Sequence, residues 1–294
     1  MSLRSLLFTP GNHARRMEKT READTDGVIL DLEDAVAVAE KPAARATAVA
    51  YLAEQRGHRK AYIRINDLST EWAFGDLAAV CVAGLDGIIL PKVQSARDLE
   101  IADYIISSHE RERGLPPGSI DVIPIIETAL AVENMNEIAR AAPRVRRLAF
   151  GSGDFTNDTG TSWTLDNPLT ALGRAQLAIV SRAAGIEAPI DTVWPNLDDE
   201  SGLSAEAASA RAMGYQGKMT IHPRQLDIIN RTFSPNPDEV AFARKLLEAF
   251  EAAEKAGSSA IVVDGKFIDY PVVFRARSVV ESAERMGMGS PSSK

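Results

Sequence analysis

Cysteine is almost absent from this chain of 294 residues, where Cys81 is the only one. A single cysteine excludes an internal disulfide and excludes a metal site built from several thiolates. Cys81 lies between Val80 and Val82, and a free cysteine among apolar residues is more typical of a protein core than of a nucleophile. We therefore expect Cys81 to be a core residue.

Long apolar runs and an excess of basic residues are also missing. No run approaches the roughly 20 residues of a membrane-spanning helix, and residues 1–11 are too short for a signal peptide. The net charge is −8, with 41 acidic against 33 basic residues, which argues against nonspecific nucleic-acid binding. We expect a cytoplasmic protein with no nucleic-acid or membrane partner, in which any anionic ligand must meet locally placed Lys and Arg.

Two catalytic motifs do not occur. The sequence contains no G-x-S-x-G motif and no P-loop lysine motif. Their absence disfavours Ser/His/Asp hydrolysis and Walker-type nucleotide hydrolysis.

Eight short apolar runs are present, and most are followed by a helix-patterned stretch. Such a series predicts a (β/α)8 TIM barrel, an α/β fold of roughly 250 residues. The eight predicted strands are Ser5–Phe8, Val28–Leu32, Tyr62–Ile65, Gly87–Leu90, Val122–Ile126, Leu148–Phe150, Pro189–Val193 and Lys218–Ile221.

The chain continues for more than 60 residues after the last predicted strand. Asn236-Pro237 is typical of a helix start, and Asp264-Gly265 is a favoured two-residue turn between strands. We expect a catalytic barrel over residues 1–232 and a C-terminal extension over residues 233–294, built as helix, hairpin and helix. Such an extension either caps its own barrel or reaches over a neighbour's active site.

Ionisable residues follow the predicted strands. Arg64, Lys92, Glu127 and Asp154 each lie where a strand ends. Active sites of TIM barrels are built at this end of the strands. The pattern therefore indicates an enzyme.

Glu127 and Asp154 follow neighbouring strands, so we expect their carboxylates to face the same cavity. Two carboxylates with water and substrate oxygens suit Mg²⁺. The glycines in Gly151–Gly153 allow close backbone approach to a ligand, and free amides there can hold a carboxylate. The alternatives are a glutamate that begins the next helix and a Gly/Asp turn without function.

Arg64 lies between two isoleucines, an unusual place for a charge in a buried strand. Its guanidinium suits a carboxylate or an enolate oxygen, although an ion pair with Asp31, Glu33 or Asp34 is the alternative. Both hold if these carboxylates orient Arg64 around a substrate. Lys92 either binds substrate or phosphate, or points to solvent.

Two further groups remain open on sequence alone. His222 ends the last predicted strand, where a structural hydrogen bond and a functional role are equally compatible with the sequence. A basic patch after the first strand is a plausible site for a polyanionic ligand, although a solvated helix face explains it equally well. The patch consists of His13, Arg15, Arg16 and Lys19.

These segments together resemble the citrate lyase beta-subunit family of the HpcH/HpaI aldolase/citrate lyase superfamily, a group of metal-dependent acyl-CoA lyases and aldolases that includes malyl- and citramalyl-CoA lyases. They occur in the family's order and span nearly the whole chain. The matching stretches are Arg4–Gly11, Asp31–Val36, Ile63–Asn66, Leu90–Val93, Ile126–Thr128, Phe150–Asp154, Gly217–Gln225 and Asp264–Pro271.

The resemblance implies roles for individual residues. Glu127 and Asp154 would be the Mg²⁺ ligands, with Mn²⁺ as a substitute, and Arg64 and Glu127 would contact substrate. The residues themselves, apart from the resemblance, make Gly153, Asp154 and Lys92 further candidates for the substrate site. Asp269 matches an aspartate that, in similar proteins, closes over the active site of an adjacent subunit, which implies a homotrimer or a dimer of trimers.

The reaction we expect is reversible carbon–carbon cleavage of a short 3-hydroxyacyl-CoA into an acyl-CoA and a 2-oxo acid, with Asp269 as the candidate for proton transfer at the acyl carbon. Three alternatives stay open. They are a malyl-CoA-type thioesterase, a citryl-thioester lyase subunit of a citrate lyase complex, and a non-catalytic CoA-metabolite binding protein.

Overall fold

The computed structural model describes residues 3–54 and 57–286. Within them the chain forms two compact units, residues 3–230 and residues 231–286. Each unit has a core of its own. Among the described residues, no helix combines the length and the apolar character that crossing a membrane requires.

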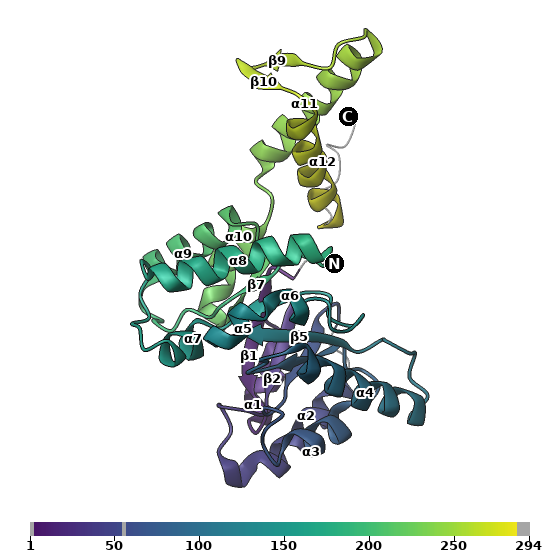
Figure 1. Cartoon of the computed structure of the whole chain (residues 1–294), viewed down its shortest axis with the longest axis vertical. Coiled ribbons are helices and arrows are strands. Elements are labelled where there is room, and N and C mark those ends of the chain that lie inside the picture. Colours follow the sequence, from purple (N-terminus) through teal and green to yellow (C-terminus); the bar gives the residue numbers. More distant parts are fainter. Residues whose placement is uncertain (1–2, 55–56, 287–294) are drawn as a thin grey trace. The chain divides into compact units, whose positions relative to one another are not determined.

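Eight parallel strands close into a barrel in sequence order, and β1 pairs with both β2 and β8 (Figure 1). The predicted TIM barrel is confirmed. The strands are β1 (Ser5–Pro10), β2 (Gly27–Asp31), β3 (Lys60–Arg64), β4 (Gly87–Leu90), β5 (Asp121–Ile126), β6 (Ala149–Phe150), β7 (Ile190–Asp191) and β8 (Gly217–Thr220).

The barrel interior is filled by alternate strand residues from every side, including Leu6, Ile29, Tyr62 and Ile123. Residues between them, such as Val28, are also fully buried, because helices cover the outer face. Burial of both faces explains why these strands read as continuous apolar runs. The interior is thus a packed core, and in such a barrel the active site is built at the carboxyl ends of the strands.

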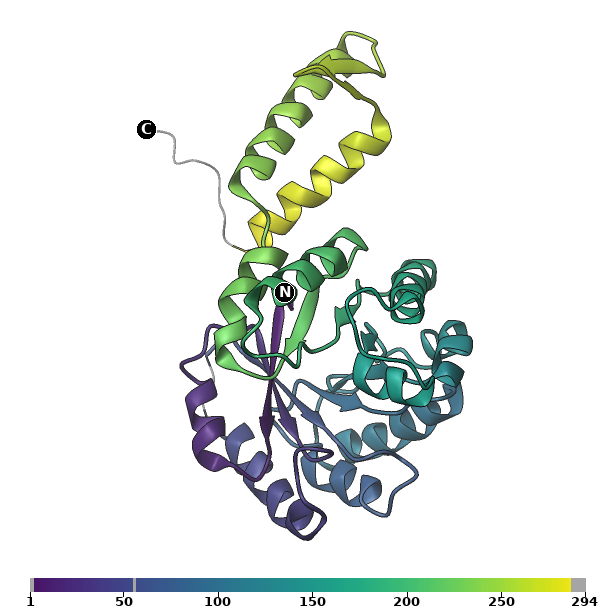
Figure 2. The ribbon, with the colours of Figure 1, turned by 90° about the vertical axis from the view of Figure 1, so that its left-hand side faces the viewer.

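Helices surround the barrel (Figure 2). They are α1 (Ala14–Thr20), α2 (Lys41–Leu52), α3 (Ala73–Val80), α4 (Ala96–Glu112), α5 (Ala129–Glu133), α6 (Met135–Ile138), α7 (Ser152–Asp158), α8 (Pro168–Ala184), α9 (Glu200–Ala212) and α10 (Leu226–Phe233), with short 3₁₀ turns η1 (Val38–Glu40) and η2 (Pro223–Gln225). Local sequence signals bound two of the longer helices: Ser95 and Asp98 form a capping box at the start of α4, and Gly185 ends α8 with a positive φ of 72°.

The sequence did not predict helix α7, which begins directly after β6. Two glycines and an aspartate favoured a turn there, yet Gly151 is the extended residue that precedes the helix and Asp154 lies in its first turn. A carboxylate in the first helical turn is stabilised by the helix dipole. Strands β6 and β7 are also shorter than predicted, with two residues each.

The C-terminal unit is a helical hairpin closed by two short strands. It contains α11 (Pro237–Lys255), β9 (Ile261–Val263), β10 (Lys266–Ile268) and α12 (Tyr270–Arg285). Asp264 and Gly265 form the predicted turn, with φ values of 48° and 75°. Leu246, Phe250 and Ile268 lie in the small core between α11, α12 and the hairpin.

Candidate active site

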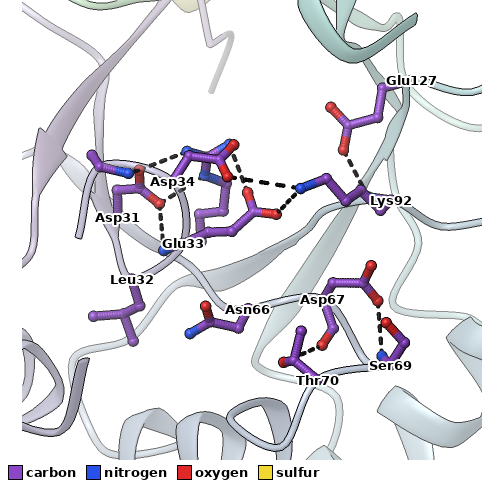
Figure 3. Close-up of polar contacts among 12 residues, drawn as sticks. Asp31, Leu32, Glu33, Asp34, Asn66, Asp67, Ser69, Thr70, Lys92 and Glu127 are labelled. Carbon is purple, nitrogen blue, oxygen red and sulfur yellow. Dashed lines mark hydrogen bonds and ion pairs between the residues drawn. The ribbon is translucent and has the colours of Figure 1, made fainter. Parts of the chain in front are cut away.

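Seven residues gather at the carboxyl ends of β2 to β6, and we call them the carboxyl-end cluster. Asp31 and Arg64 are the last residues of adjacent strands and face each other in register. The cluster consists of Asp31, Glu33, Asp34, Arg64, Lys92, Glu127 and Asp154. Figure 3 labels five of them: Asp31, Glu33, Asp34, Lys92 and Glu127. The barrel thus brings together the residues that the sequence singled out after these strands.

Arg64 is held on two sides by carboxylates. Its Nε and Nη2 donate to the two oxygens of Asp31 at 2.7 and 2.6 Å, and its Nη1 lies 2.8 Å from Glu33 Oε2. The guanidinium also lies over the ring of Phe8, 4.9 Å from its centroid. Although burial opposes its charge, Asp31 and Glu33 raise the pKa of Arg64 above its usual value. The ion-pair reading of Arg64 is therefore correct, and it fixes the direction of the side chain.

The loop that carries these carboxylates is itself locked by a buried lysine. Lys41 Nζ donates to the carbonyl oxygens of Leu32 and Glu33, each at 2.9 Å, and to Asn66 Oδ1. Asp31 in turn accepts from the backbone amide of Glu33 at 2.9 Å. The sequence analysis missed Lys41, whose only signal was a charge at the start of an otherwise apolar-patterned helix.

Lys92 connects different parts of the cluster. Its backbone amide donates to Glu127 Oε1 at 2.7 Å, and its Nζ donates to Glu33 Oε1 at 2.8 Å (Figure 3). The ammonium also lies 3.7 Å from Asp34. Lys92 therefore uses its charge within the protein, and a direct contact with substrate stays a prediction.

Glu127 is a buried acid, with 3% of its surface exposed. Among the described residues it forms no ion pair within 4.0 Å, in contrast to Asp31 and Glu33. Burial, followed by the negative charge of Asp154, raises the pKa of Glu127 to about 8. Without a cation, this carboxyl therefore retains a proton at neutral pH.

Gly151 gives Glu127 the room it occupies. A Cβ at position 151 would lie 2.5 Å from Glu127 Oε2 and 2.7 Å from Glu127 Cβ. Both contacts are closer than carbon atoms accept, so only glycine fits without displacement of the carboxylate.

The residues present fit a divalent cation. The carboxyl-end cluster sets five carboxylates against two cationic side chains. The described part of the chain contains no group of three or more His, Cys, Asp or Glu residues placed to hold a metal. Glu127 and Asp154 together offer an open, oxygen-only donor pair, which is the kind that Mg²⁺ takes with water and substrate.

The predicted row of free amides after β6 is wrong in two positions. The Gly151 amide donates to the Ile126 carbonyl at 3.0 Å, and the Ser152 amide donates to Thr192 Oγ1 at 2.9 Å. Both amides therefore have partners within the barrel and are not free to hold a ligand. Gly153 and Asp154 lie in the first turn of α7, where amides have no partner within the helix.

The basic patch and His222 come together at the carboxyl ends of β1 and β8. Arg16, Lys19 and His222 line a cavity of about 460 Å³ with Thr9 and Pro10. His222 also accepts a hydrogen bond from the Arg224 amide at 3.1 Å. The structural role of His222 is thus present, and its position on the cavity keeps the functional role open.

Asp269 belongs to the C-terminal unit, where it precedes α12. Its side chain accepts from the Val272 amide, a typical helix cap. The structure therefore gives Asp269 a local role, and its catalytic role stays a prediction.

The sequence analysis also missed a charged cluster between β7, β8, α8 and α9, which we call the β7–β8 cluster. Lys218 Nζ donates to Asp191 at 2.8 Å and to Glu206 at 2.5 Å, and Arg174 binds both oxygens of Asp191 at 2.9 Å. Lys218 and Asp191 are fully buried. A lysine inside an apolar strand was the available signal, the same one that drew attention to Arg64.

A closed parallel barrel with an acidic cluster at the carboxyl ends of its strands is the arrangement of a TIM-barrel enzyme site. Residues 4–223 match the model of the HpcH/HpaI aldolase/citrate lyase family. The chain belongs to this family, as the resemblance of its segments indicated.

Curated relatives extend over nearly the whole chain. Citrate lyase subunit beta of Leuconostoc mesenteroides subsp. cremoris is 36% identical over 283 residues, covering 95% of this chain and 93% of the relative. A (3S)-malyl-CoA thioesterase of Cereibacter sphaeroides is 36% identical over 282 residues, covering 96% and 94%. Close similarity to a lyase subunit and to a thioesterase identifies the family and leaves the outcome of the reaction open.

Solved structures show the same fold. The protein CitE of Mycobacterium tuberculosis, in complex with magnesium, acetoacetate and coenzyme A, has a TM-score of 0.79 and 29% identity, covering 96% of this chain and 98% of CitE. The citrate lyase beta subunit of the same organism, complexed with oxaloacetate and magnesium, has a TM-score of 0.67 and 30% identity, covering 80% and 98%. This chain thus belongs to an aldolase/citrate lyase family, and its fold is shared by proteins whose structures contain magnesium with acetoacetate and coenzyme A, or magnesium with oxaloacetate.

Proposed function

We propose that this protein is a magnesium-dependent lyase that cleaves, or forms, a short 3-hydroxyacyl-CoA by a retro-Claisen reaction. The products are an acyl-CoA and a 2-oxo acid. One observation carries the proposal: a buried Glu127 without an ion pair among the described residues, with a pKa near 8, beside Asp154 and close to a fixed arginine. The carboxylates of such a site require a bound cation, and its arginine offers a positive charge to an oxyanion.

Glu127 and Asp154 are the proposed metal ligands. When bound, Mg²⁺ supplies Lewis acidity toward the carboxylate and carbonyl oxygens of a 2-oxo acid, and Mn²⁺ is the expected substitute. Lys92 keeps Glu127 oriented through its amide, at 2.7 Å. The amides of Gly153 and Asp154 are the proposed donors to the carboxylate of the oxo acid.

Arg64 is the proposed stabiliser of the charge that develops on the oxo-acid side during cleavage. Its Nε and Nη2 are taken by Asp31, and its Nη1 is taken by Glu33, so the guanidinium is held rigidly before substrate arrives. Preorganised donors of this kind lower the barrier because they need no rearrangement during the reaction.

The cavity lined by Arg16, Lys19 and His222 is the proposed place for the anionic part of CoA. This cavity presents two cationic side chains, Arg16 and Lys19, at the carboxyl ends of β1 and β8. Phosphates bind well to such local basic groups even in an acidic protein.

Asp269 is the proposed acid–base group at the acyl carbon, contributed by a neighbouring subunit. This role requires a homo-oligomer, for which a trimer or a dimer of trimers is proposed. The C-terminal unit forms a folded body with its own core, which suits a part that acts on another copy.

A complementation experiment tests this arrangement. Glu127→Gln and Asp269→Asn should each lose turnover when purified alone. Co-expression of the two variants should restore a fraction of the activity, because mixed oligomers then contain sites with both residues intact. Active Asp269→Asn alone, or no recovery in verified mixed oligomers, would remove Asp269 in trans from the proposal.

Product analysis distinguishes the lyase from its alternatives. The purified chain is incubated with Mg²⁺ and with malyl-, citramalyl-, methylmalyl- or citryl-CoA, and products are identified by mass. Acyl-CoA with a 2-oxo acid indicates the lyase, whereas free CoA with a hydroxy acid indicates a thioesterase, which the Cereibacter sphaeroides relative favours. Turnover restricted to a carrier-bound thioester would indicate a citrate lyase subunit, as in the Leuconostoc relative. Tight binding without turnover would indicate a non-catalytic binding protein.

A further inference from the structure

One residue joins the two working parts of the carboxyl-end cluster. On one side the Lys92 amide donates to Glu127 Oε1, and on the other side the Lys92 ammonium donates to Glu33 Oε1. Glu33 presents its second oxygen to Arg64 Nη1 at 2.8 Å. Figure 3 shows Lys92 between Glu127 and the acidic loop after β2, with a contact on each side.

The backbone of Lys92 is in an unusual conformation. Its φ is 51°, in the left-handed region, and among the described residues the only other non-glycine position with a positive φ is Asp264, which forms the hairpin turn. The sequence Leu90-Pro91-Lys92 offers no glycine to relieve it. A left-handed non-glycine residue is unfavourable and persists where its surroundings fix it, often at functional sites. Here the conformation turns the amide toward Glu127.

We propose that Lys92 is a positioning residue that couples the two halves of the site: its left-handed backbone orients Glu127 and its ammonium orients Arg64 through Glu33. This inference rests on the proposed function and deepens it. It is an alternative to the expectation that Lys92 binds a phosphate or substrate, because its amide and its ammonium both have partners in the protein. The two couplings are chemically separate, so different substitutions address them.

Lys92→Met removes the ammonium and keeps the amide. Since Glu33 then lacks one partner, Arg64 is held less well, and kcat should fall about tenfold, the usual effect of losing one charged hydrogen bond. KM and the Mn²⁺ dissociation constant should stay within about twofold of the wild type, because neither Glu127 nor a substrate contact is lost. Lys92→Arg should restore most of kcat.

Lys92→Val addresses the backbone as well. A β-branched residue strongly disfavours the left-handed region, whereas glycine accepts it. Lys92→Val should therefore weaken Mn²⁺ binding about tenfold beyond Lys92→Gly, although both lack the ammonium. Mn²⁺ binding is measured by electron paramagnetic resonance, which does not depend on turnover.

Lys60→Met provides the matched control. Lys60 forms an ion pair of similar length, 2.7 Å to Asp86, at the opposite end of the neighbouring strand β3. Its loss should leave kcat and Mn²⁺ binding unchanged. Thermal melts of all variants confirm that the barrel is folded.

Two results would overturn the inference. An unchanged kcat for Lys92→Met would show that the ammonium does not position Arg64, and a KM rise alone would return Lys92 to substrate binding. Equal Mn²⁺ affinities for the Val and Gly variants would show that the backbone conformation does not orient Glu127. If the wild type turns over none of the CoA thioesters, the proposed function fails. The Mn²⁺ affinities of the Val and Gly variants then still decide whether the Lys92 backbone orients Glu127.

Discussion

Two charged clusters in this barrel differ in their charge balance. The β7–β8 cluster pairs Arg174 and Lys218 with Asp191 and Glu206, so its two cations match its two carboxylates in a fully buried place. The carboxyl-end cluster sets Arg64 and Lys92 against five carboxylates. In the β7–β8 cluster the protein's own cationic side chains neutralise the carboxylates, whereas the carboxyl-end cluster requires a cation from outside the protein.

The two glutamates illustrate the difference. Glu206 lies 2.5 Å from Lys218 Nζ, while Glu127 accepts an amide hydrogen bond from Lys92, lies near the negative charge of Asp154 and has no ion pair among the described residues. A buried acid without a cation costs stability. Such a cost, maintained at the carboxyl ends of barrel strands, is typical of a functional site rather than of a structural one.

Glu127→Gln gives the sharpest contrast between the clusters. The amide keeps the shape of the side chain but is a poor ligand for Mg²⁺, so turnover should fall by about 10³-fold or more. Steady-state kinetics with saturating Mg²⁺ and calorimetric titration of Mg²⁺ provide the measurement. Activity close to that of the wild type would end the metal assignment.

The pH dependence of stability tests the excess acid directly. The pKa of Glu127 is about 8 in the folded protein and returns to its ordinary value on unfolding. A raised pKa means that the folded state binds the proton more tightly than the unfolded state. The contribution of Glu127 to the free energy of unfolding is therefore full at low pH and is lost as the pH rises from about 4.5 through about 8. In EDTA, Glu127→Gln should therefore gain stability over the wild type with rising pH, by up to about 4 kcal/mol at pH 9.

Urea unfolding at pH 5, 7 and 9 measures this difference. Addition of Mg²⁺ should stabilise the wild type alone and narrow the gap at high pH, because only the wild type binds the ion. A constant gap across the pH range would mean that Glu127 titrates normally.

Lys218→Met should act on stability instead of turnover. Loss of the ammonium leaves Glu206 and part of Asp191 buried without a cation, which should lower the free energy of unfolding by about 3 kcal/mol. Folded enzyme should keep its kcat, since the β7–β8 cluster contacts none of the proposed reacting groups. Lys255→Met, which removes an exposed pair with Glu251, should leave unfolding unchanged.

Cys81 lies outside both clusters, at the end of α3, and has the smallest expected effect. Burial raises the pKa of its thiol to about 12. Alkylation by iodoacetamide at pH 8 should therefore be about 10³-fold slower than for an exposed thiol, and should leave activity intact until the barrel unfolds. Rapid modification with loss of turnover would contradict its place in the core.

The barrel could be predicted from sequence because its strands are largely buried on both faces and several helices, such as α4 and α8, carry a capping signal. Local pattern and fold agree at β1 to β5 and at α4 and α8. Prediction failed at α7, because Gly151 to Asp154 favours a turn locally while helix packing after a two-residue strand decides otherwise. Tertiary context overrode the local signal there.

The candidate site could be predicted in part for the same reason. Arg64 and Glu127 stand out as charges at the ends of apolar strands, and residues that end parallel strands lie at the same end of the barrel. The partners of Lys92 were not readable, since a left-handed backbone leaves no mark in the sequence Pro91-Lys92-Val93. Contacts between distant segments, such as Arg174 with Asp191, depend on packing that spacing alone does not encode.

Gly151 carries a consequence for variation in this enzyme. Its own atoms do no chemistry, yet a methyl group there would press on Glu127 and Ile125 at less than 3 Å. Exchange of Gly151 for alanine would therefore abolish activity by displacing Glu127, although every ionisable group of the site would still be present. A comparison of charged residues alone would not detect this loss, because it depends on the space that a single carbon atom at position 151 would fill.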